Sequence, residues 1–468
     1  MVIKNSLYKY FFLVTHFCYG QLFYTENNYF DSLENDNNNE FSLELNQFQI
    51  WNKYLKAKKI NYLKSHHFGI FLNYYNESNS NIIQEKSDLI GNGLLTNYHF
   101  NYKRLEISNS IFFTDDYIEA KRGFVRTIKN VTMYTNQAYF KYSNSLDSLS
   151  FSFKLGRDFL IEGYGNTAKL FFSNYSRPFD QITLTANYRN IYNKISAIRL
   201  DDLDNYERNL YMHSISYKSE KLDFTVGEAI ISSGLSESIN IKYLNPFNFW
   251  SWENIGSTTN GLNAFLFSGM SFKVKPSLNL YFEILIDDVN FHQKNAFYLN
   301  RYAYLLGVKF ISFPFKSSLL LIENSNVLNQ VYQSYDPSHV FTHMGYPIGH
   351  HLGNDFINYR MHYSQILKSK INKIFFDYSY LIKGQNSLET PFENPWENNN
   401  GEFNVNYKHP GFPTPPLTYF CEFNFGLEIK LKDYTYLILS LENNNYTEEK
   451  LLSKIRIRFW TYMNIKNE

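Results

Sequence analysis

Apolar and polar side chains alternate without exception in residues 149–155. One face carries Leu149, Phe151, Phe153 and Leu155, and the other carries Ser150, Ser152 and Lys154. Successive side chains of a β-strand point to opposite sides, so this segment is predicted to be a strand with one apolar and one polar face. Such a strand suits the wall of a membrane barrel and also one sheet of a soluble sandwich.

Similar period-two segments continue to the C-terminus and are separated by polar breaks. Clear examples are residues 181–188, 211–217, 222–229, 278–286 and 454–465. At about 10 residues per strand plus turns, these residues predict about 16–18 antiparallel strands. We find no fixed-period repeat that would favour a solenoid or propeller. The apolar pattern persists to the last segment, which provides a strand that closes the sheet. The predicted fold is therefore all-β, a large antiparallel transmembrane β-barrel over residues 64–468.

The first 63 residues follow different patterns. Residues 1–20 place Lys4 and Lys9 around a short apolar run that ends at Gly20, which predicts a signal peptide. In residues 21–63, apolar side chains recur at mixed spacings of two, three and four, which predicts a short helical or irregular periplasmic segment. No run of about 18 apolar residues is present, so a membrane location requires a closed barrel.

Composition agrees with a membrane barrel. The 468 residues include 19% aromatic side chains, with 40 Tyr and 43 Phe, and aromatic residues gather at both interfaces of membrane barrels. The net charge of +1 gives no reason to expect a nucleic-acid partner. Only Cys421 would remain after removal of residues 1–20, so no intrachain disulfide is expected.

The polar end of the strand at residues 149–155 leads into Arg157, Asp158 and Glu162. Carboxylates accept and guanidinium groups donate bidentate hydrogen bonds, so these three residues could bind sugar hydroxyls. Alternatively, they form a charge network that braces the barrel lumen. We expect no glycosidase activity from the two acids, because paired acids are common inside barrels.

Further polar and aromatic candidates lie in or next to the predicted loops at residues 232–259, 323–354 and 384–416. For polysaccharide binding or a lumen network these are Glu228, Asn245, Trp250, Trp252, His343 and Asp355. The two tryptophans could stack on sugar rings or anchor the loop at the membrane interface. His343, His350, His351 and Asp355 match no compact metal-binding spacing, so neither a metal nor another cofactor is expected. There is no Gly-x-Ser-x-Gly elbow, and we do not expect an enzyme.

Three groups of motifs resemble the Wzi-type capsule-assembly proteins of the outer membrane, and more closely their Bacteroidetes relatives, which include RemB-like gliding-motility proteins. The motifs are Gly156-Arg157-Asp158 with Gly163-Tyr164-Gly165 and Pro178-Phe179-Asp180, Gly227-Glu228 with Leu244-Asn245-Pro246, and residues 341–349 with Gly353-Asn354-Asp355. The resemblance covers most of the chain after about residue 60. It implies a barrel of about eighteen strands in the outer membrane and a lectin-like function.

Together, the pattern and the resemblance predict an outer-membrane barrel that binds and retains or assembles capsular or surface polysaccharide. Its expected partners are that polysaccharide and outer-membrane lipid. Two alternatives remain at this stage. One is a porin-like channel, and the other is an envelope component of a gliding-motility or adhesion system that binds protein.

Overall fold

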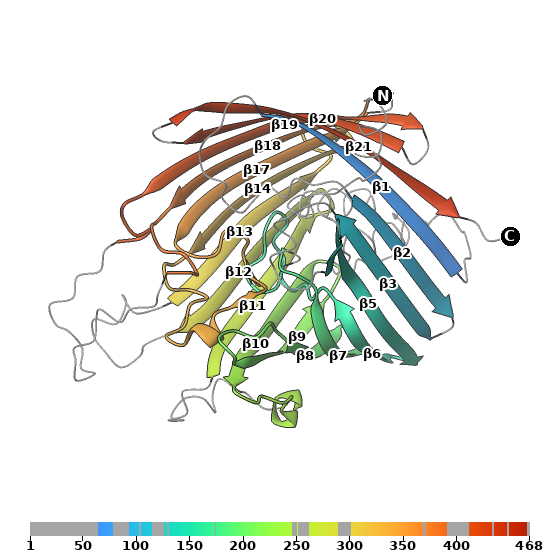
Figure 1. Cartoon of the computed structure of the whole chain (residues 1–468), viewed down its shortest axis with the longest axis vertical. Helices are drawn as coiled ribbons and strands as arrows, with labels where there is room; N and C mark the ends of the chain where they lie inside the picture. The colour runs from blue at the N-terminus through green and yellow to red at the C-terminus, as the bar shows by residue number, and fades with distance from the viewer. Residues whose placement is uncertain are drawn as a thin grey trace.

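In the computed structural model, the described residues form a barrel that contains loops inside its wall (Figure 1). They are residues 64–77, 93–102, 104–114, 126–128, 131–173, 175–245, 250, 262–288, 301–367, 371–390, 411–432, 435–446 and 449–465. The predicted signal peptide and the predicted helical segment at residues 21–63 lie outside this set. Within the set, no helix has the length and apolar character needed to cross a membrane.

The N-terminal half of the barrel contains ten strands. They are β1 (Lys64–Glu77), β2 (Gly93–Tyr102), β3 (Leu105–Thr114), β4 (Arg126–Ile128), β5 (Val131–Leu146), β6 (Leu149–Asp158), β7 (Phe179–Tyr188), β8 (Ile191–Arg199), β9 (Glu207–Lys218) and β10 (Leu222–Gly234). A short 3-10 helix, η2 (Ile241–Leu244), follows β10.

The second half contains eleven further strands. They are β11 (Leu262–Lys275), β12 (Leu278–Asp288), β13 (Arg301–Ile311), β14 (Ser318–Val327), β15 (Thr342–His343), β16 (Tyr346–Pro347), β17 (Phe356–Ile366), β18 (Ile371–Lys383), β19 (Thr418–Lys432), β20 (Thr435–Tyr446) and β21 (Glu449–Ile465). The connection between β14 and β17 holds the 3-10 turn η4 (Pro337–His339) and the small β15–β16 hairpin.

The main sheet has 19 strands and closes on itself, because β1 pairs with both β2 and β21. Eighteen of these strands form the ring, and β4 pairs only with β5. All neighbours in the ring are antiparallel, and closure leaves no unpaired edge. The predicted all-β barrel is confirmed, with a strand count at the upper end of the expected range.

The two faces of the wall differ as the alternating pattern predicts. On the outer face of β6, Phe151 is 39% exposed. On its inner face, the hydroxyl of Ser152 lies 2.6 Å from that of Thr185 on β7. Where side chains are described, the outer face is apolar around the ring. The inner face is mostly polar or small, except on β8–β14, where residues such as Phe265, Phe267 and Leu305 pack against the loops in the lumen. The apolar exterior is opposite to that of a soluble sandwich and matches a barrel surrounded by lipid.

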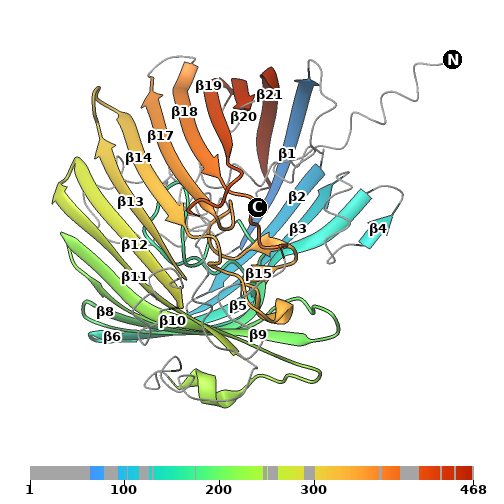
Figure 2. The ribbon, with the colours of Figure 1, turned by 90° about the vertical axis from the view of Figure 1, so that its left-hand side faces the viewer.

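The two ends of the barrel are also different. At one end, neighbouring strands are joined by tight turns such as 147–148, 189–190 and 276–277. At the other end lie the long connections 159–178, 235–261, 328–355 and 384–417. Outer-membrane barrels have short periplasmic turns and longer extracellular loops, so the long connections mark the extracellular mouth. The β6–β7 connection and parts of the β14–β17 connection enter the lumen (Figure 2).

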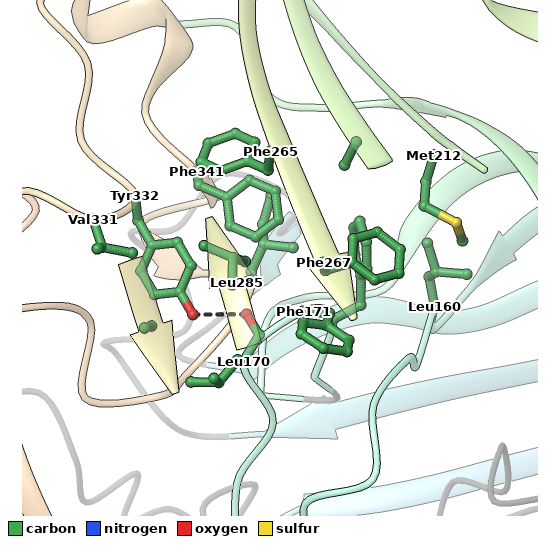
Figure 3. Close-up of a cluster of buried hydrophobic side chains, with 14 of the residues drawn as sticks. Leu160, Leu170, Phe171, Met212, Phe265, Phe267, Leu285, Val331, Tyr332 and Phe341 are labelled. Carbon is green, nitrogen blue, oxygen red and sulfur yellow. Dashed lines mark hydrogen bonds between the residues drawn. The ribbon is translucent and has the colours of Figure 1, made fainter. Parts of the chain in front are cut away.

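The hydrophobic core lies inside the barrel, between these two connections and the inner faces of β8–β14. Its loop residues include Leu170, Phe171 and Phe341. The ring of Phe171 packs on Phe267 of β11, and the ring of Phe341 packs on Phe265 of the same strand (Figure 3). Burying one large apolar side chain contributes about 1.5–3 kcal/mol, so the cluster stabilises the loops in the lumen. We call residues 159–178 the plug arm and residues 328–355 the mouth loop.

Candidate functional site

Two buried glutamates of the lumen wall hold the plug arm. Glu283 of β12 accepts hydrogen bonds from the backbone N–H groups of Tyr164, Gly165 (2.5 Å) and Leu170 (2.7 Å). Such bonds to a charged acceptor contribute about 1.5–3 kcal/mol each, and they compensate the carboxylate for its loss of water. The segment 164–170 is therefore fixed to the wall by its backbone.

The second glutamate is Glu323 of β14. It accepts from the backbone N–H groups of Asn166 (2.5 Å) and Thr167 (2.9 Å), and from the hydroxyl of Tyr281 at 2.7 Å. The ammonium group of Lys169 lies nearby and donates to the carbonyl oxygens of two glycines, at 3.0 Å and 2.7 Å. The arm thus presents N–H donors to two carboxylates and carbonyl acceptors to one lysine.

The Gly163-Tyr164-Gly165 motif is explained by this close approach. Gly163 has a φ of +123°, and a Cβ atom there would come within 2.6 Å of the Glu283 carboxylate. A Cβ atom at Gly165 would collide with the carbonyl oxygen of Ala168. Glycine tolerates both the positive φ and the narrow space. Tyr164 between them points to the wall, and its hydroxyl lies 2.7 Å from Thr225 of β10.

Of the three charged residues predicted near this strand, two lie in the lumen. Asp158 accepts from Gln137 at 2.5 Å and from Lys154 at 2.8 Å. Glu162 forms an ion pair with Lys194 of β8 at 2.9 Å. Both carboxylates are thus bonded to side chains of the wall. This is the bracing charge network that the sequence analysis gave as the alternative to sugar binding.

The sequence places Arg157 in the lumen or at its rim, and the structure contradicts the lumen position. Arg157 follows Phe151 and Leu155 on the outer face, and its guanidinium forms two hydrogen bonds with Asp180 of the neighbouring strand β7. The alternation continues through the strand end, so an odd-numbered residue in β6 must point outward.

Glu228 and Trp250 come together, but on the outside of the wall. Glu228 shares the outer face of β10 with Val226 and accepts from the Trp250 backbone N–H at 2.7 Å. The indole of Trp250 stacks on His213 of β9, whose Nε2 lies 2.9 Å from Glu228. Trp250 is 1% exposed, so a sugar ring cannot stack on it as one alternative supposed.

The segment that carries η2 covers this part of the outer wall. Tyr243 packs against Tyr211 and Trp250, and Asn245 ends η2 by donating its backbone N–H to Lys242 at 3.5 Å. In both views, η2 lies outside the wall below β10 (Figure 2). Asn245 is therefore a structural residue at the end of a turn. Trp252 lies outside the described residues.

His343 lies in the mouth loop. Its ring packs on Phe179, and its Nδ1 lies 3.3 Å from Asp201 in the β8–β9 turn. Burial opposes the charged form of Asp201, but bonds from His343 and Met344 and the charge of Arg208 hold its pKa below the usual value. This carboxylate is therefore ionised at neutral pH and joins the turn to the mouth loop.

Asp355 ends the mouth loop. Its carboxylate accepts from the backbone N–H groups of Thr414 at 2.8 Å and Asn386 at 3.0 Å. Burial raises the pKa of Asp355, although these bonds act against the shift. It fixes the β18–β19 connection to the start of β17. Among the described residues, no group of three or more His, Cys, Asp or Glu side chains could hold a metal ion.

The sequence reasoning missed Glu283, Glu323 and Arg208. The alternation in residues 278–286 places Glu283 opposite the apolar face, but its partners are more than 100 residues away in the chain. Arg208 of β9 is fully buried and donates to the carbonyl oxygens of Ser338 and Val340. It thereby attaches the mouth loop to the wall. No local sequence pattern predicts that these residues attach the loops to the wall.

A closed ring of antiparallel strands with an apolar exterior and loops folded into its lumen defines an outer-membrane β-barrel protein. Among solved structures, the fold is similar to that of Wzi from Escherichia coli, described as a carbohydrate-binding β-barrel involved in group 1 capsule assembly. The two chains are 11% identical, the match covers 96% of this chain and 98% of Wzi, and the TM-score is 0.57. The predicted Wzi-like fold is confirmed.

Two further solved structures are less similar. OccD3 (OpdP) of Pseudomonas aeruginosa is 9% identical over 86% of this chain and 91% of its own, with a TM-score of 0.48. OccAB4 of Acinetobacter baumannii is 12% identical over 86% and 99%, also with a TM-score of 0.48. No protein-family model matches the sequence. No curated protein is recognisably similar to it in sequence.

Proposed function

We propose that this outer-membrane barrel binds surface or capsular polysaccharide at its extracellular mouth and helps to retain or assemble it. The observation that carries the proposal is the filled lumen beside β8–β14, where the plug arm and mouth loop form one buried hydrophobic cluster with the wall. A wall lined in this way suits a rigid platform for the mouth loops better than a water-filled channel. The proposed binding face is therefore the outer surface of these loops.

Two exposed tyrosines mark this face. Tyr335 of the mouth loop is 77% exposed and Tyr206 of the β8–β9 turn is 39% exposed. Arg208, two residues after Tyr206, donates to the Ser338 and Val340 carbonyl groups, so the two segments are attached to each other. Aromatic rings pack on the apolar faces of sugars, and the acidic side chains of the turn accept hydrogen bonds from sugar hydroxyls.

The binding test uses purified full-length protein in detergent and polysaccharide extracted from the cells that carry it. If each ring contributes about 0.5–1.5 kcal/mol, as in aromatic pairs, the double substitution Tyr206→Ala and Tyr335→Ala weakens binding by about 5- to 150-fold. The matched control is Tyr188→Ala, because Tyr188 is 49% exposed at the opposite end of the barrel. Equal affinity of all three proteins would refute this binding face.

A second measurement separates the proposal from a channel function. A plugged barrel is expected to pass little current in planar lipid bilayers, and a porin passes a steady ionic current. A large, steady conductance of the unmodified protein, together with no affinity for polysaccharide, would favour the porin alternative. Retention of the normal surface coat after deletion of the gene would also contradict the proposal and would leave an envelope protein as the better partner.

A further inference from the structure

A serine, a histidine and an aspartate meet at the extracellular mouth. Ser233 lies at the end of β10, and its Oγ is 2.8 Å from Nε2 of His339 in η4. On the other side of the imidazole, Nδ1 is 3.8 Å from Oδ2 of Asp336. A nucleophile within hydrogen-bond reach of a base, with the base beside a third group, is the arrangement that activates a serine hydroxyl.

The histidine is held firmly in this position. Asp336 caps η4 by accepting from the Ser338 backbone N–H at 2.9 Å. Asn263 of β11 donates to the carbonyl oxygen of His339 at 3.2 Å. Arg208 donates to the carbonyl oxygen of Ser338, the residue before His339, at 2.5 Å. His339 is 2% exposed, so its ring has little freedom to leave Ser233.

The carboxylate of Asp336 contacts both the hydroxyl beside Ser233 and the imidazole of His339. Its Oδ1 accepts the proton of the Ser338 hydroxyl at 2.7 Å, so the Ser338 oxygen is the acceptor for the Ser233 hydroxyl, 2.6 Å away. Its Oδ2 faces Nδ1 of His339, so its charge favours a proton on that nitrogen. With the proton on Nδ1, Nε2 can accept from the Ser233 hydroxyl, 2.8 Å away, once that hydroxyl turns from Ser338 to His339.

The constellation lies close to the surface of the mouth. Ser233 is half-buried, Asp336 is 40% exposed at its side chain, and Tyr335 beside it is largely exposed. We propose that Ser233 is the nucleophile of an acyl-transfer site, with His339 as general base and Asp336 as a positioning residue. Its substrate class is the O-acyl ester, as in acetylated sugars. The choice of acetylated sugars as the substrate rests on the proposed function, and the acyl-transfer site itself does not.

The reaction balances without a cofactor. Ser233 Oγ attacks the ester carbonyl carbon while its proton passes to Nε2 of His339. The bond to the sugar oxygen then breaks, and His339 returns the proton to that oxygen, which leaves as a free hydroxyl. Water next attacks the acyl-serine with His339 again accepting a proton, and the carboxylic acid and free Ser233 are released.

The first test uses full-length protein in detergent with a fluorophosphonate probe and 4-nitrophenyl acetate. We expect covalent labelling of Ser233, located by mass spectrometry, and ester hydrolysis that Ser233→Ala removes. His339→Gln should lower the rate by about 100-fold or more. Asp336→Asn should lower kcat with KM unchanged, because it orients the base and does not bind the ester. Thermal unfolding checks that each variant is folded.

The matched control is Ser232→Ala. Ser232 is the neighbouring serine, faces the outer side of β10 and bonds to Glu237, so its removal should leave labelling and hydrolysis unchanged. Absence of label at Ser233 in the folded protein, or labelling that survives His339→Gln undiminished, would overturn the acyl-transfer site.

The second test measures acetate released from O-acetylated surface polysaccharide. Release by the unmodified protein but not by Ser233→Ala supports the assigned substrate. Hydrolysis of 4-nitrophenyl acetate without release from the polysaccharide refutes that substrate and retains the acyl-transfer site. Binding of polysaccharide by the folded Ser233→Ala variant is measured in parallel, so failure of the proposed binding function is seen separately.

Discussion

Removing the negative charge of Glu283 should release the plug arm without unfolding the barrel. In Glu283→Gln, one oxygen can still accept from Tyr164 and Gly165, but the new amide NH2 faces the Leu170 N–H that had bonded to the other oxygen at 2.7 Å. One buried donor is then left unsatisfied, which costs about 1–3 kcal/mol, and the remaining bonds lose their charge assistance. We expect the arm to be destabilised by about 3 kcal/mol.

Because every 1.4 kcal/mol is a factor of ten, the population with an open arm should rise roughly 100-fold. Native-state hydrogen exchange measures this population, and a larger open population gives faster exchange of the amides of residues 164–170. The amides of the barrel strands should keep their protection, since the ring hydrogen bonds are untouched. The conductance of single barrels in planar bilayers should show more frequent openings.

The matched control is Glu220→Gln, at an exposed acid in the β9–β10 turn at the opposite end of the barrel. It should change neither exchange nor conductance. If the amides of residues 164–170 in Glu283→Gln exchange as slowly as in the unmodified protein, then apolar packing alone holds the arm and the reasoning about the carboxylate is refuted.

Two further predictions concern the same loops. Burial and the positive charge of Arg360 lower the pKa of His351 from 6.5 to about 3, so the unfolded loop gains a proton below pH 6.5 that the folded loop does not. Burial also lowers the pKa of the neighbouring His350 well below 6.5. The mouth loop should therefore lose up to about 2.8 kcal/mol per pH unit as pH falls from 6.5, about 1.4 kcal/mol from each histidine, and His351→Gln should halve this dependence when loop opening is followed by limited proteolysis. Gly163→Ala should destabilise the plug arm by about 1–3 kcal/mol, because alanine is strained at a φ of +123° and its Cβ approaches Glu283; unchanged hydrogen exchange in the arm would contradict this.

The wall of the barrel is the part that the sequence predicts well. A strand between lipid and a polar lumen must alternate, so residues such as Phe151 and Ser152 reveal their faces locally. The alternation also predicts the face of Arg157, because residues an even number of positions apart, such as Phe151 and Arg157, lie on the same side of a strand. The chemistry of Arg157 suggested the lumen, but its position in the alternation required the outer face.

The contents of the lumen could not be predicted in this way. Glu283 meets the plug arm across more than 100 residues of chain, and no periodicity reports such a contact. Trp250 is similar, because its place outside the wall depends on how the segment after β10 folds back over β9 and β10. Ser233 and His339 are also separated by 106 positions and share no sequence motif.

The pairing of β1 with β21 has a consequence for how this chain matures. Residues such as Phe71 and Trp460, opposite each other in that pair, are among the first and last of the ring to leave the ribosome. Joining the ends of a flexible segment of this length costs about 5 kcal/mol in chain entropy, so the seam is the least favourable contact to form early. The ring therefore stays open along one line until its first and last strands meet, and loss of the final strand would leave two unsatisfied edges in the bilayer.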